Sequence, residues 1–227
     1  MAYWLLKMVL TPVLFLFWRV RVEGREHVPA SGGAVLAANH QSFCDSFFLP
    51  LVVARKVTYL AKAEYFDSPR TAWFFRALGQ IPIRRGSGKE AERALETAAG
   101  ALAEGRLVAI YPEGTRSLDE FVHRGRTGVA RLSRECGVQV VPVGIQGTVG
   151  VQPVGKRLLR PGKTVVVRFG PPMRMPPAAD RQHPLEDHDH RECRAFTDEL
   201  MREISRLSGR PYVDEYVPKP SPAPSPA

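Results

Sequence analysis

Short apolar runs alternate along the chain with longer segments whose apolar residues recur at helical spacing. A short apolar run without a helical period predicts a buried strand. Such runs occupy residues 20–24, 33–37, 57–61, 79–85, 106–110, 138–145 and 163–169. Pro142 lies inside the run 138–145, and because proline cannot donate a backbone hydrogen bond, it predicts an edge strand or a bulge there.

The segments between these runs predict helices over residues 44–53, 70–78, 88–104, 127–136 and 190–207. In the segment 88–104, for example, Ala94, Ala98 and Leu102 share one face at a spacing of 3.6 residues. Strands that alternate with helices are typical of an α/β fold. We therefore predict a mostly parallel central sheet flanked by helices.

The first 18 residues are almost wholly apolar, but Lys7 and Pro12 interrupt them. The run is shorter than the roughly 20 apolar residues that cross a bilayer, and no small-residue cleavage site of a secretory signal follows it. We expect a membrane-associating helix that lies in or dips into the interface, with aromatic residues and the following arginines at the cytoplasmic face. The alternative is a helix packed on the domain.

These patterns divide the chain into three parts. Residues 1–19 are predicted to associate with a membrane, and residues 20–210 to form one domain, which 227 residues readily accommodate. Residues 211–227 are rich in proline and are predicted to be a disordered tail.

Composition narrows the choice of partners. The formal net charge is +9 and the sequence pI is about 9.8, so anionic partners are favoured: nucleic acid, anionic lipid or phosphorylated small molecules. The three cysteines are widely spaced and lack metal-ligand spacing, which argues against a disulfide framework. The cluster of acidic residues, histidines and Cys193 at 187–193 could suggest a metal site, but we interpret it as a solvated segment and predict no metal.

Candidate chemistry begins where the predicted strand 33–37 ends, at Asn39 and His40, with Asp45 five residues further on. In α/β folds, ligands bind at the carboxyl ends of strands. Asp45 is close enough in sequence to bond one ring nitrogen of His40, which would leave the other nitrogen free to accept a proton. The alternatives are a histidine without a catalytic role and an aspartate that only caps the following helix.

Two further loops follow predicted strands and carry polar residues. Arg84 and Arg85 end one strand, and Glu113, Gly114, Thr115 and Arg116 follow another. Guanidinium groups bind phosphate in bidentate fashion, and glycine lets the backbone approach a ligand. If the three loops meet in one cleft, they would bind a phosphorylated substrate from which His40 removes a proton. Alternatively, the arginines are a solvated pair, and Glu113 forms a local ion pair with Arg116.

Four ordered motifs now carry a family resemblance: N-H-x4-D at 39–45, G-x-I-x-I-x-R at 79–85, E-G-T-R at 113–116 and V-P-V at 141–143. Over residues 20–170 the chain resembles the glycerolipid acyltransferases, and among them the bacterial 1-acyl-glycerol-3-phosphate acyltransferases. The second motif departs from the family in having Arg84 where aspartate is frequent, while Arg124-Gly125 keeps the family's basic residue and glycine after the third motif.

The resemblance implies transfer of a fatty acyl group from acyl-CoA or acyl-ACP to the hydroxyl of a lysophospholipid acceptor at an anionic membrane surface, on the cytoplasmic face of the cell membrane. It implies no nucleic acid partner and no cofactor. His40 would be the general base and Asp45 its partner, while Asn39, Arg84, Arg85 and the segment 113–116 would bind substrate.

Several alternatives stay open at this stage. The acceptor could be glycerol-3-phosphate, another lysophospholipid or a glycolipid, or the chain could be an inactive membrane-binding module of the same fold. Ser42 and Cys44 are rival nucleophiles, although the absence of G-x-S-x-G argues against a serine hydrolase.

Overall fold

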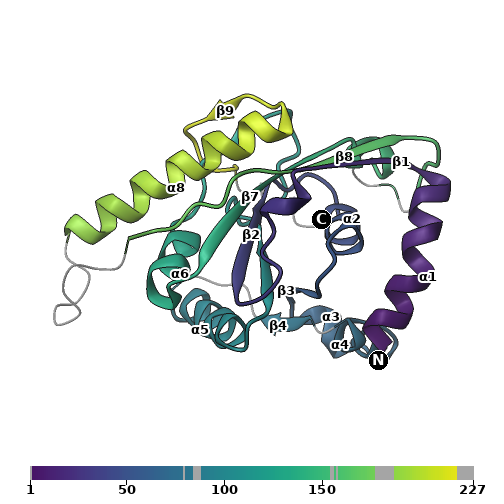
Figure 1. Ribbon diagram of the computed structural model, residues 1–227, viewed down its shortest axis with the longest axis horizontal. Helices are drawn as coiled ribbons and strands as arrows, with labels where there is room; N and C mark the ends of the chain where they lie inside the picture. The colour runs from purple at the N-terminus through teal and green to yellow at the C-terminus, as the bar shows by residue number, and fades with distance from the viewer. Residues whose placement is uncertain are drawn as a thin grey trace, which may run out of the picture.

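The structure is a computed structural model that describes residues 2–78, 80–83, 88–153, 156, 158–176 and 187–218. Its described residues form a seven-stranded sheet (Figure 1). The strand order is β1 (Arg19–Glu23), β8 (Thr164–Phe169), β7 (Gln139–Gln146), β2 (Ala34–Ala38), β5 (Leu107–Ile110), β3 (Val57–Lys62) and β4 (Ile81–Ile83). Only β7 and β8 are antiparallel among these pairs, so the prediction of a mostly parallel sheet is confirmed.

Helices cover both faces of this sheet. Figure 1 shows α1 and α2 on one side and α5, α6 and α8 on the other. The helices in the described residues are α1 (Ala2–Phe17), α2 (Asp45–Val52), α3 (Glu64–Asp67), α4 (Pro69–Ala77), α5 (Lys89–Ala103), α6 (Gly128–Cys136), α7 (Thr148–Val151) and α8 (Asp187–Ser208), with a short 3-10 helix, η1 (Arg25–His27).

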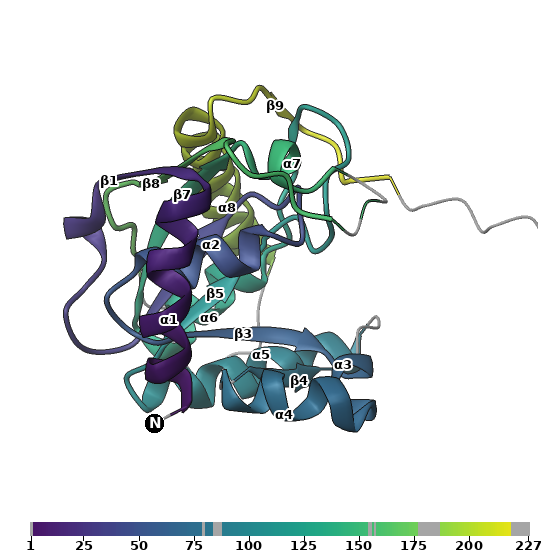
Figure 2. The ribbon, with the colours of Figure 1, turned by 90° about the vertical axis from the view of Figure 1, so that its right-hand side faces the viewer.

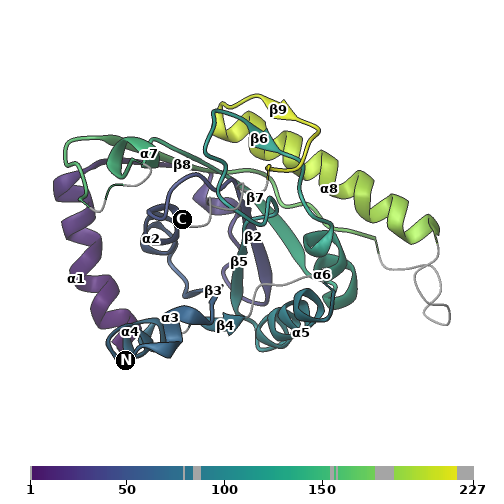
Figure 3. The same ribbon diagram turned by 180° about the vertical axis from the view of Figure 1, so that it is seen from behind.

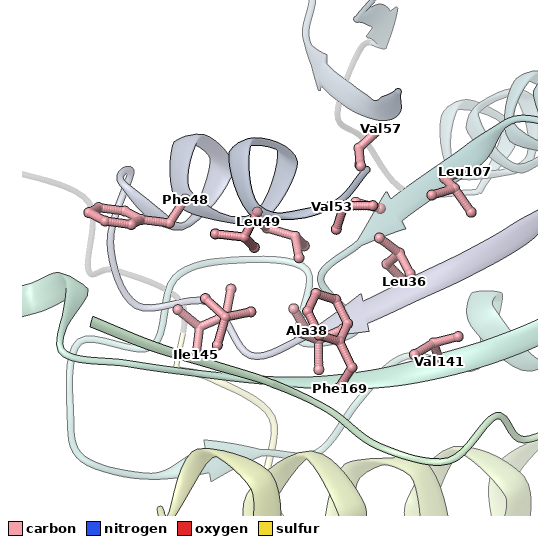
Figure 4. Close-up of a cluster of buried hydrophobic side chains, with 14 of the residues drawn as sticks. Leu36, Ala38, Phe48, Leu49, Val53, Val57, Leu107, Val141, Ile145 and Phe169 are labelled. Atoms are coloured by element: carbon pink, nitrogen blue, oxygen red, sulfur yellow. The ribbon is translucent and has the colours of Figure 1, made fainter. Parts of the chain in front are cut away.

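The central strand β2 supplies both halves of the core. Leu36 packs on the α2 side with Leu49 and Phe169 (Figure 4), whereas Val35 packs on the α5, α6 and α8 side with Leu102. Side chains alternate across a strand, so a strand buried on both faces is apolar at every position. This explains why β2 appears in the sequence as an unbroken apolar run.

Strand β7 decides between the edge and the bulge that we predicted at Pro142. It lies between β8 and β2, so Pro142 is inside the sheet and not at its edge. Val143 pairs with Phe169 but Val140 bridges Met173, so the pairing shifts by one residue beside Pro142. The proline therefore occupies the kind of irregularity at which a missing N–H group is tolerated.

The C-terminal segment corrects the prediction that the whole of residues 211–227 is a disordered tail. Residues 212–213, which we assigned to a disordered tail, form β9 (Tyr212–Val213), and β9 pairs with β6 (Val122–His123). Figure 3 shows this two-stranded ribbon beside the end of α8. Residues 219–227 of the predicted tail lie outside the described residues.

Helix α1 runs alongside α2 (Figure 2). Tyr3 and Leu14 are buried, and Lys7 Nζ donates hydrogen bonds to the carbonyl oxygens of Pro50 and Val53. The other faces of α1 expose large apolar residues: Trp4, Leu5, Met8, Val9, Val13, Phe15, Leu16 and Phe17. No helix among the described residues has both the length and the apolar character needed to cross a bilayer.

The contact between β7 and α8 yields a stability prediction. A Cβ atom on Gly144 would lie 2.3 Å from the backbone carbon of Leu207, a distance at which the backbone must shift. We expect Gly144→Ala to lower the free energy of unfolding by about 1–3 kcal/mol, as overpacking does. Urea unfolding followed by circular dichroism measures this change.

The matched control is Gly100→Ala, at an exposed position of α5 where the new Cβ meets no atom within 4 Å. Because glycine is a poor helix residue, this variant should have a free energy of unfolding about 0.5–1 kcal/mol higher than that of the wild type. Equal stability changes in the two variants would contradict our account of the β7–α8 contact.

Candidate active site

The site lies at the carboxyl ends of β2 and β5, which are adjacent parallel strands. The loop after β2 carries Asn39 to Asp45, and the loop after β5 carries Tyr111 to Arg116. Two backbone contacts join the loops, because the His40 N–H donates to Glu113 Oε1 over 3.2 Å and the Ser117 N–H donates to the His40 carbonyl over 2.8 Å. The sheet order thus brings together two of the three predicted loops.

His40 and Asp45 are in hydrogen-bond contact. His40 Nδ1 lies 3.0 Å from Asp45 Oδ2. The carboxylate accepts, so Nδ1 carries the proton and Nε2 keeps a free lone pair. Nε2 has no hydrogen-bond partner among the residues that the structure describes, and the side chain remains 12% exposed. The imidazole can therefore accept a proton from a molecule that reaches its exposed edge.

The same carboxylate oxygen shapes the turn. Asp45 Oδ2 also accepts hydrogen bonds from the backbone N–H groups of Gln41, over 2.8 Å, and Ser42, over 2.9 Å. Asp45 is only 1% exposed, and a buried charge requires such partners. The N-cap of α2 is Cys44 and no side chain caps this helix, so the alternative that Asp45 only caps it is wrong.

Tyr111 holds the imidazole from one side. The two rings stack with centroids 3.8 Å apart and an interplanar angle of 10°. The Tyr111 hydroxyl lies 3.0 Å from Ser46 Oγ on α2, and burial raises the Tyr111 pKa far above its ordinary value. We did not identify Tyr111 from sequence, since an aromatic residue at the end of a strand looks like core, and its role depends on a contact across the sheet.

Asn39 fixes the end of β2 to β7. Its Oδ1 accepts from the Ile145 N–H over 2.8 Å and its Nδ2 donates to the Ile145 carbonyl over 2.9 Å. The side chain is 1% exposed. These bonds extend the pairing of β2 with β7 beyond the end of β2. The amide that we assigned to substrate binding therefore bonds the backbone of β7.

Glu113 is a buried acid between two histidine backbones. It is 2% exposed, its Oε1 faces the His40 N–H and its Oε2 accepts from the His123 N–H over 3.4 Å. Burial raises its pKa to about 7, although both backbone hydrogen bonds favour the charged form. No ion pair joins Glu113 to Arg116 within the described part of the chain, so the local pair considered above is wrong.

Behind Glu113, His123 and Asp119 stabilise the loop. His123 Nε2 lies 2.9 Å from Asp119 Oδ2, and its Nδ1 lies 3.2 Å from the Glu215 carbonyl oxygen. Partial burial opposes the charge on Asp119, but hydrogen bonds from Ser117, Phe121 and His123 lower its pKa. The sequence shows this histidine without indicating its partners.

The remaining predicted residues differ in their placement. Gly114, Thr115 and Arg116 are exposed, and Gly114 has φ +77°, which favours glycine. The Arg116 side chain forms no hydrogen bond or ion pair with a described residue, so its guanidinium group is free to bind an anion. Arg84 and Arg85 lie outside the described residues. No group of three or more His, Cys, Asp or Glu side chains in the described ranges could hold a metal ion.

Comparisons with known proteins agree with this architecture. A family model described as Acyltransferase matches residues 19–146. A 1-acyl-sn-glycerol-3-phosphate acyltransferase of Chlamydomonas reinhardtii is 35% identical over 153 residues, which cover 66% of this chain and 46% of that protein. A Bacillus subtilis protein of the same name is 27% identical over 201 residues, covering 87% of this chain and 92% of that one.

A solved structure is also similar. The crystal structure of the 1-acyl-sn-glycerophosphate acyltransferase PlsC from Thermotoga maritima matches with a TM-score of 0.64 at 28% identity, covering 90% of this chain and 78% of that chain. The match to the Arabidopsis thaliana chloroplastic relative covers 45% of that protein at 30% identity and 70% of this chain. The chain thus spans about half the length of its algal and plant relatives.

The raised pKa of Glu113 predicts a pH dependence of stability. Between about 4.5, the ordinary carboxyl value, and about 7, the folded state retains a proton that the unfolded state has lost. The free energy of unfolding therefore falls as pH rises through this window and then levels off. A shift of this size corresponds to a loss on the order of 3 kcal/mol.

Urea unfolding measures the free energy of unfolding of the wild type and of Glu113→Gln at steps between about pH 4 and 8. The difference between the two curves of free energy against pH isolates the contribution of Glu113. Glu199→Gln, at an exposed carboxyl group on α8, is the control. A flat difference curve for Glu113→Gln would rule out the assigned titration.

Proposed function

The chain belongs to the Acyltransferase family, and we propose that it is a 1-acylglycerol-3-phosphate O-acyltransferase. It would move a fatty acyl group from acyl-CoA or acyl-ACP to the free hydroxyl of its acceptor, giving phosphatidic acid. The observation that carries this proposal is the His40–Asp45 contact, which leaves Nε2 without a hydrogen-bond partner among the described residues. The names of the similar proteins support the acceptor class.

The proposed reaction uses His40 twice. Nε2 takes the proton of the acceptor hydroxyl while the hydroxyl oxygen attacks the thioester carbon. The carbon–sulfur bond then breaks, and the imidazolium returns the proton to the departing thiolate. Asp45 stabilises the transient imidazolium through Nδ1, and the stacked Tyr111 ring restricts rotation of the imidazole.

Direct transfer is preferred over an acyl-enzyme because the two rival nucleophiles are poorly placed. Ser42 and Cys44 are each 3% exposed. The Ser42 hydroxyl lies 3.4 Å from the Gln152 carbonyl oxygen, and burial raises the pKa of Cys44 to about 11. A thiol with so high a pKa is almost entirely protonated at neutral pH and is a weak nucleophile.

The acceptor phosphate needs a cationic partner near His40. Arg116 supports this role because it is exposed, lies in the loop bonded to the His40 backbone, and has no partner among the described residues. Guanidinium binds phosphate through parallel hydrogen bonds. We assign Arg116 to this phosphate, and propose Arg84 and Arg85 as further phosphate ligands from their motif alone.

A water-insoluble acceptor places the site at a lipid surface. The exposed apolar faces of α1 support a peripheral or monotopic attachment to the cytoplasmic face of the cell membrane, because large apolar side chains bind at the headgroup boundary. Arg19 and Arg21 follow directly on α1, are exposed, and can meet lipid phosphates. The membrane would thus deliver the acceptor to the cleft.

The base assignment predicts that His40→Ala loses transfer without losing the fold. Removal of a general base lowers kcat by roughly 10²–10⁴-fold. The turn should persist, because Asp45 Oδ2 keeps its hydrogen bonds from Gln41 and Ser42. The assay follows labelled acyl-CoA with a panel of lyso-acceptors, and the melting temperature reports folding. Substantial transfer by the folded variant would refute the role of His40.

Arg116→Ala is the companion variant in this assay. It should raise the KM for the phosphorylated acceptor and leave kcat for a neutral monoacylglycerol acceptor unchanged, because only the phosphate contact is lost. If KM rises equally for both acceptors, the phosphate assignment is incorrect.

The membrane proposal predicts that the triple variant Leu5→Gln, Met8→Gln, Leu16→Gln no longer floats with anionic vesicles. All three residues are more than half exposed, so the fold should be retained. The matched control, Leu5→Met, Met8→Leu, Leu16→Met, keeps the apolar surface and should float as the wild type does. Flotation of the polar variant would require another attachment surface.

A further inference from the structure

A groove of about 650 Å³ lies between α8 and the chain that follows the Glu113–Arg116 loop. Figure 3 shows α8, β6 and β9 together in this part of the molecule. The polar and aromatic residues that line the groove are Thr127, His190, Arg191, Arg194, Asp198 and Tyr216. None of the four sequence motifs contains any of these residues, and the proposed reaction does not use them. The volume falls within the range of about 300–1,000 Å³ that small ligands occupy.

The lining carries an excess of positive charge. Arg194 donates to the Gly125 carbonyl over 2.7 Å and to Asp198 Oδ1 over 2.5 Å, which neutralises the single carboxylate of the lining. Arg191 is exposed and forms no ion pair with any residue that the structure describes. An anion in the groove therefore meets one unpaired guanidinium group and another that is already held in position.

An aromatic surface adjoins these charges. Tyr216 is 49% exposed, and the guanidinium carbons of Arg124 and Arg126 lie 5.5 Å and 5.6 Å from its ring centroid. Aromatic rings and guanidinium planes are the surfaces on which proteins stack nucleic acid bases. The groove thus combines guanidinium donors for phosphate with planar groups for a base.

The chain beside the groove is bonded to the loop of the candidate active site. The Arg126 N–H donates to the Pro112 carbonyl over 2.8 Å. A Cβ atom on Gly114 would lie 2.9 Å from Arg126 Nε, so the arginine side chain rests against the E-G-T-R loop. The neighbouring Glu113 bonds the His40 backbone. These contacts link the chain next to the groove residue Thr127 with the His40 backbone, and the arm of a long flexible ligand would have to follow this chain to reach His40.

We propose that this groove binds the phosphorylated nucleotide end of CoA. The inference rests on the proposed function, because it identifies the donor of that reaction. A CoA thioester has phosphates and adenine at one end, the reacting carbonyl at the other, and a long flexible arm between them. An open groove that carries guanidinium and aromatic groups can take the nucleotide end of such a ligand, whereas a carrier protein would cover a broad surface, about 800 Å² on each partner.

The test measures binding of CoA and dephospho-CoA to the full-length protein by calorimetry, and the donor KM in the transfer assay. Arg191→Glu places a negative charge where the guanidinium was, so it should weaken CoA binding at least about tenfold, and dephospho-CoA binding less. Tyr216→Ala should weaken both ligands to a similar extent, since each keeps the adenine. In both variants the donor KM should rise while kcat stays near that of the wild type.

The control is Arg206→Glu, at an exposed arginine of α8 outside the groove that pairs with Glu203. It makes the same change of charge on the same helix and should leave CoA affinity unchanged. Arg191 is exposed, so its variant should fold, and a melting temperature near that of the wild type verifies this.

The outcomes separate this inference from the proposed function. Unchanged CoA affinity and donor KM in both Arg191→Glu and Tyr216→Ala would overturn the groove assignment, even if transfer to lysophosphatidic acid is observed. A loss of transfer from acyl-ACP alone would also overturn it and identify a carrier-protein surface. CoA binding that depends on Arg191, without transfer to lysophosphatidic acid, would support the groove and refute the proposed acceptor.

Discussion

One carboxylate oxygen organises the candidate active site. Asp45 Oδ2 accepts hydrogen bonds from His40 Nδ1 and from the backbone N–H groups of Gln41 and Ser42. Its burial makes these partners necessary, because an unpaired buried charge is very costly. The turn therefore depends on a single atom, and the imidazole is oriented by that atom together with the stacked Tyr111 ring. The same bonds leave Nε2 as the free nitrogen, which is the atom that the proposed reaction uses.

The parts of the site that could be predicted are those encoded locally. His40 and Asp45 are five residues apart in one turn, so their contact follows from spacing and the end of a strand. The contact between the first and third loops depends on one further fact, that β2 and β5 are neighbours in the sheet. An alternating pattern of strands and helices indicates a sheet but does not specify which strands are neighbours. Tyr111 and the Asn39–Ile145 bonds depend on contacts distant in sequence, and neither residue carries a local signal for them.

The errors in the fold have a similar physical origin. Strands β6 and β9 have two residues each, too few to show a period in the sequence, and they pair across about 90 residues of chain. A proline-rich segment after α8 looked like a tail because its structure comes from partners elsewhere, such as the Val122 N–H that donates to the Pro211 carbonyl. Pro142 obeyed its local rule, because the ladder on one side of β7 is irregular beside it, but the sequence left open whether the proline marked an edge or a bulge.

The C-terminal segment connects the two ligand sites that we propose. The Arg124 N–H donates to the Glu215 carbonyl, and the same carbonyl oxygen faces His123 Nδ1. Tyr216, the next residue, lines the groove. A donor nucleotide that contacts Tyr216 therefore also restrains the chain that supports His123, Glu113 and, through Glu113, the His40 backbone. Binding of the donor would thus reduce the freedom of the loop to which we assign the acceptor phosphate, which would favour alignment of the two substrates.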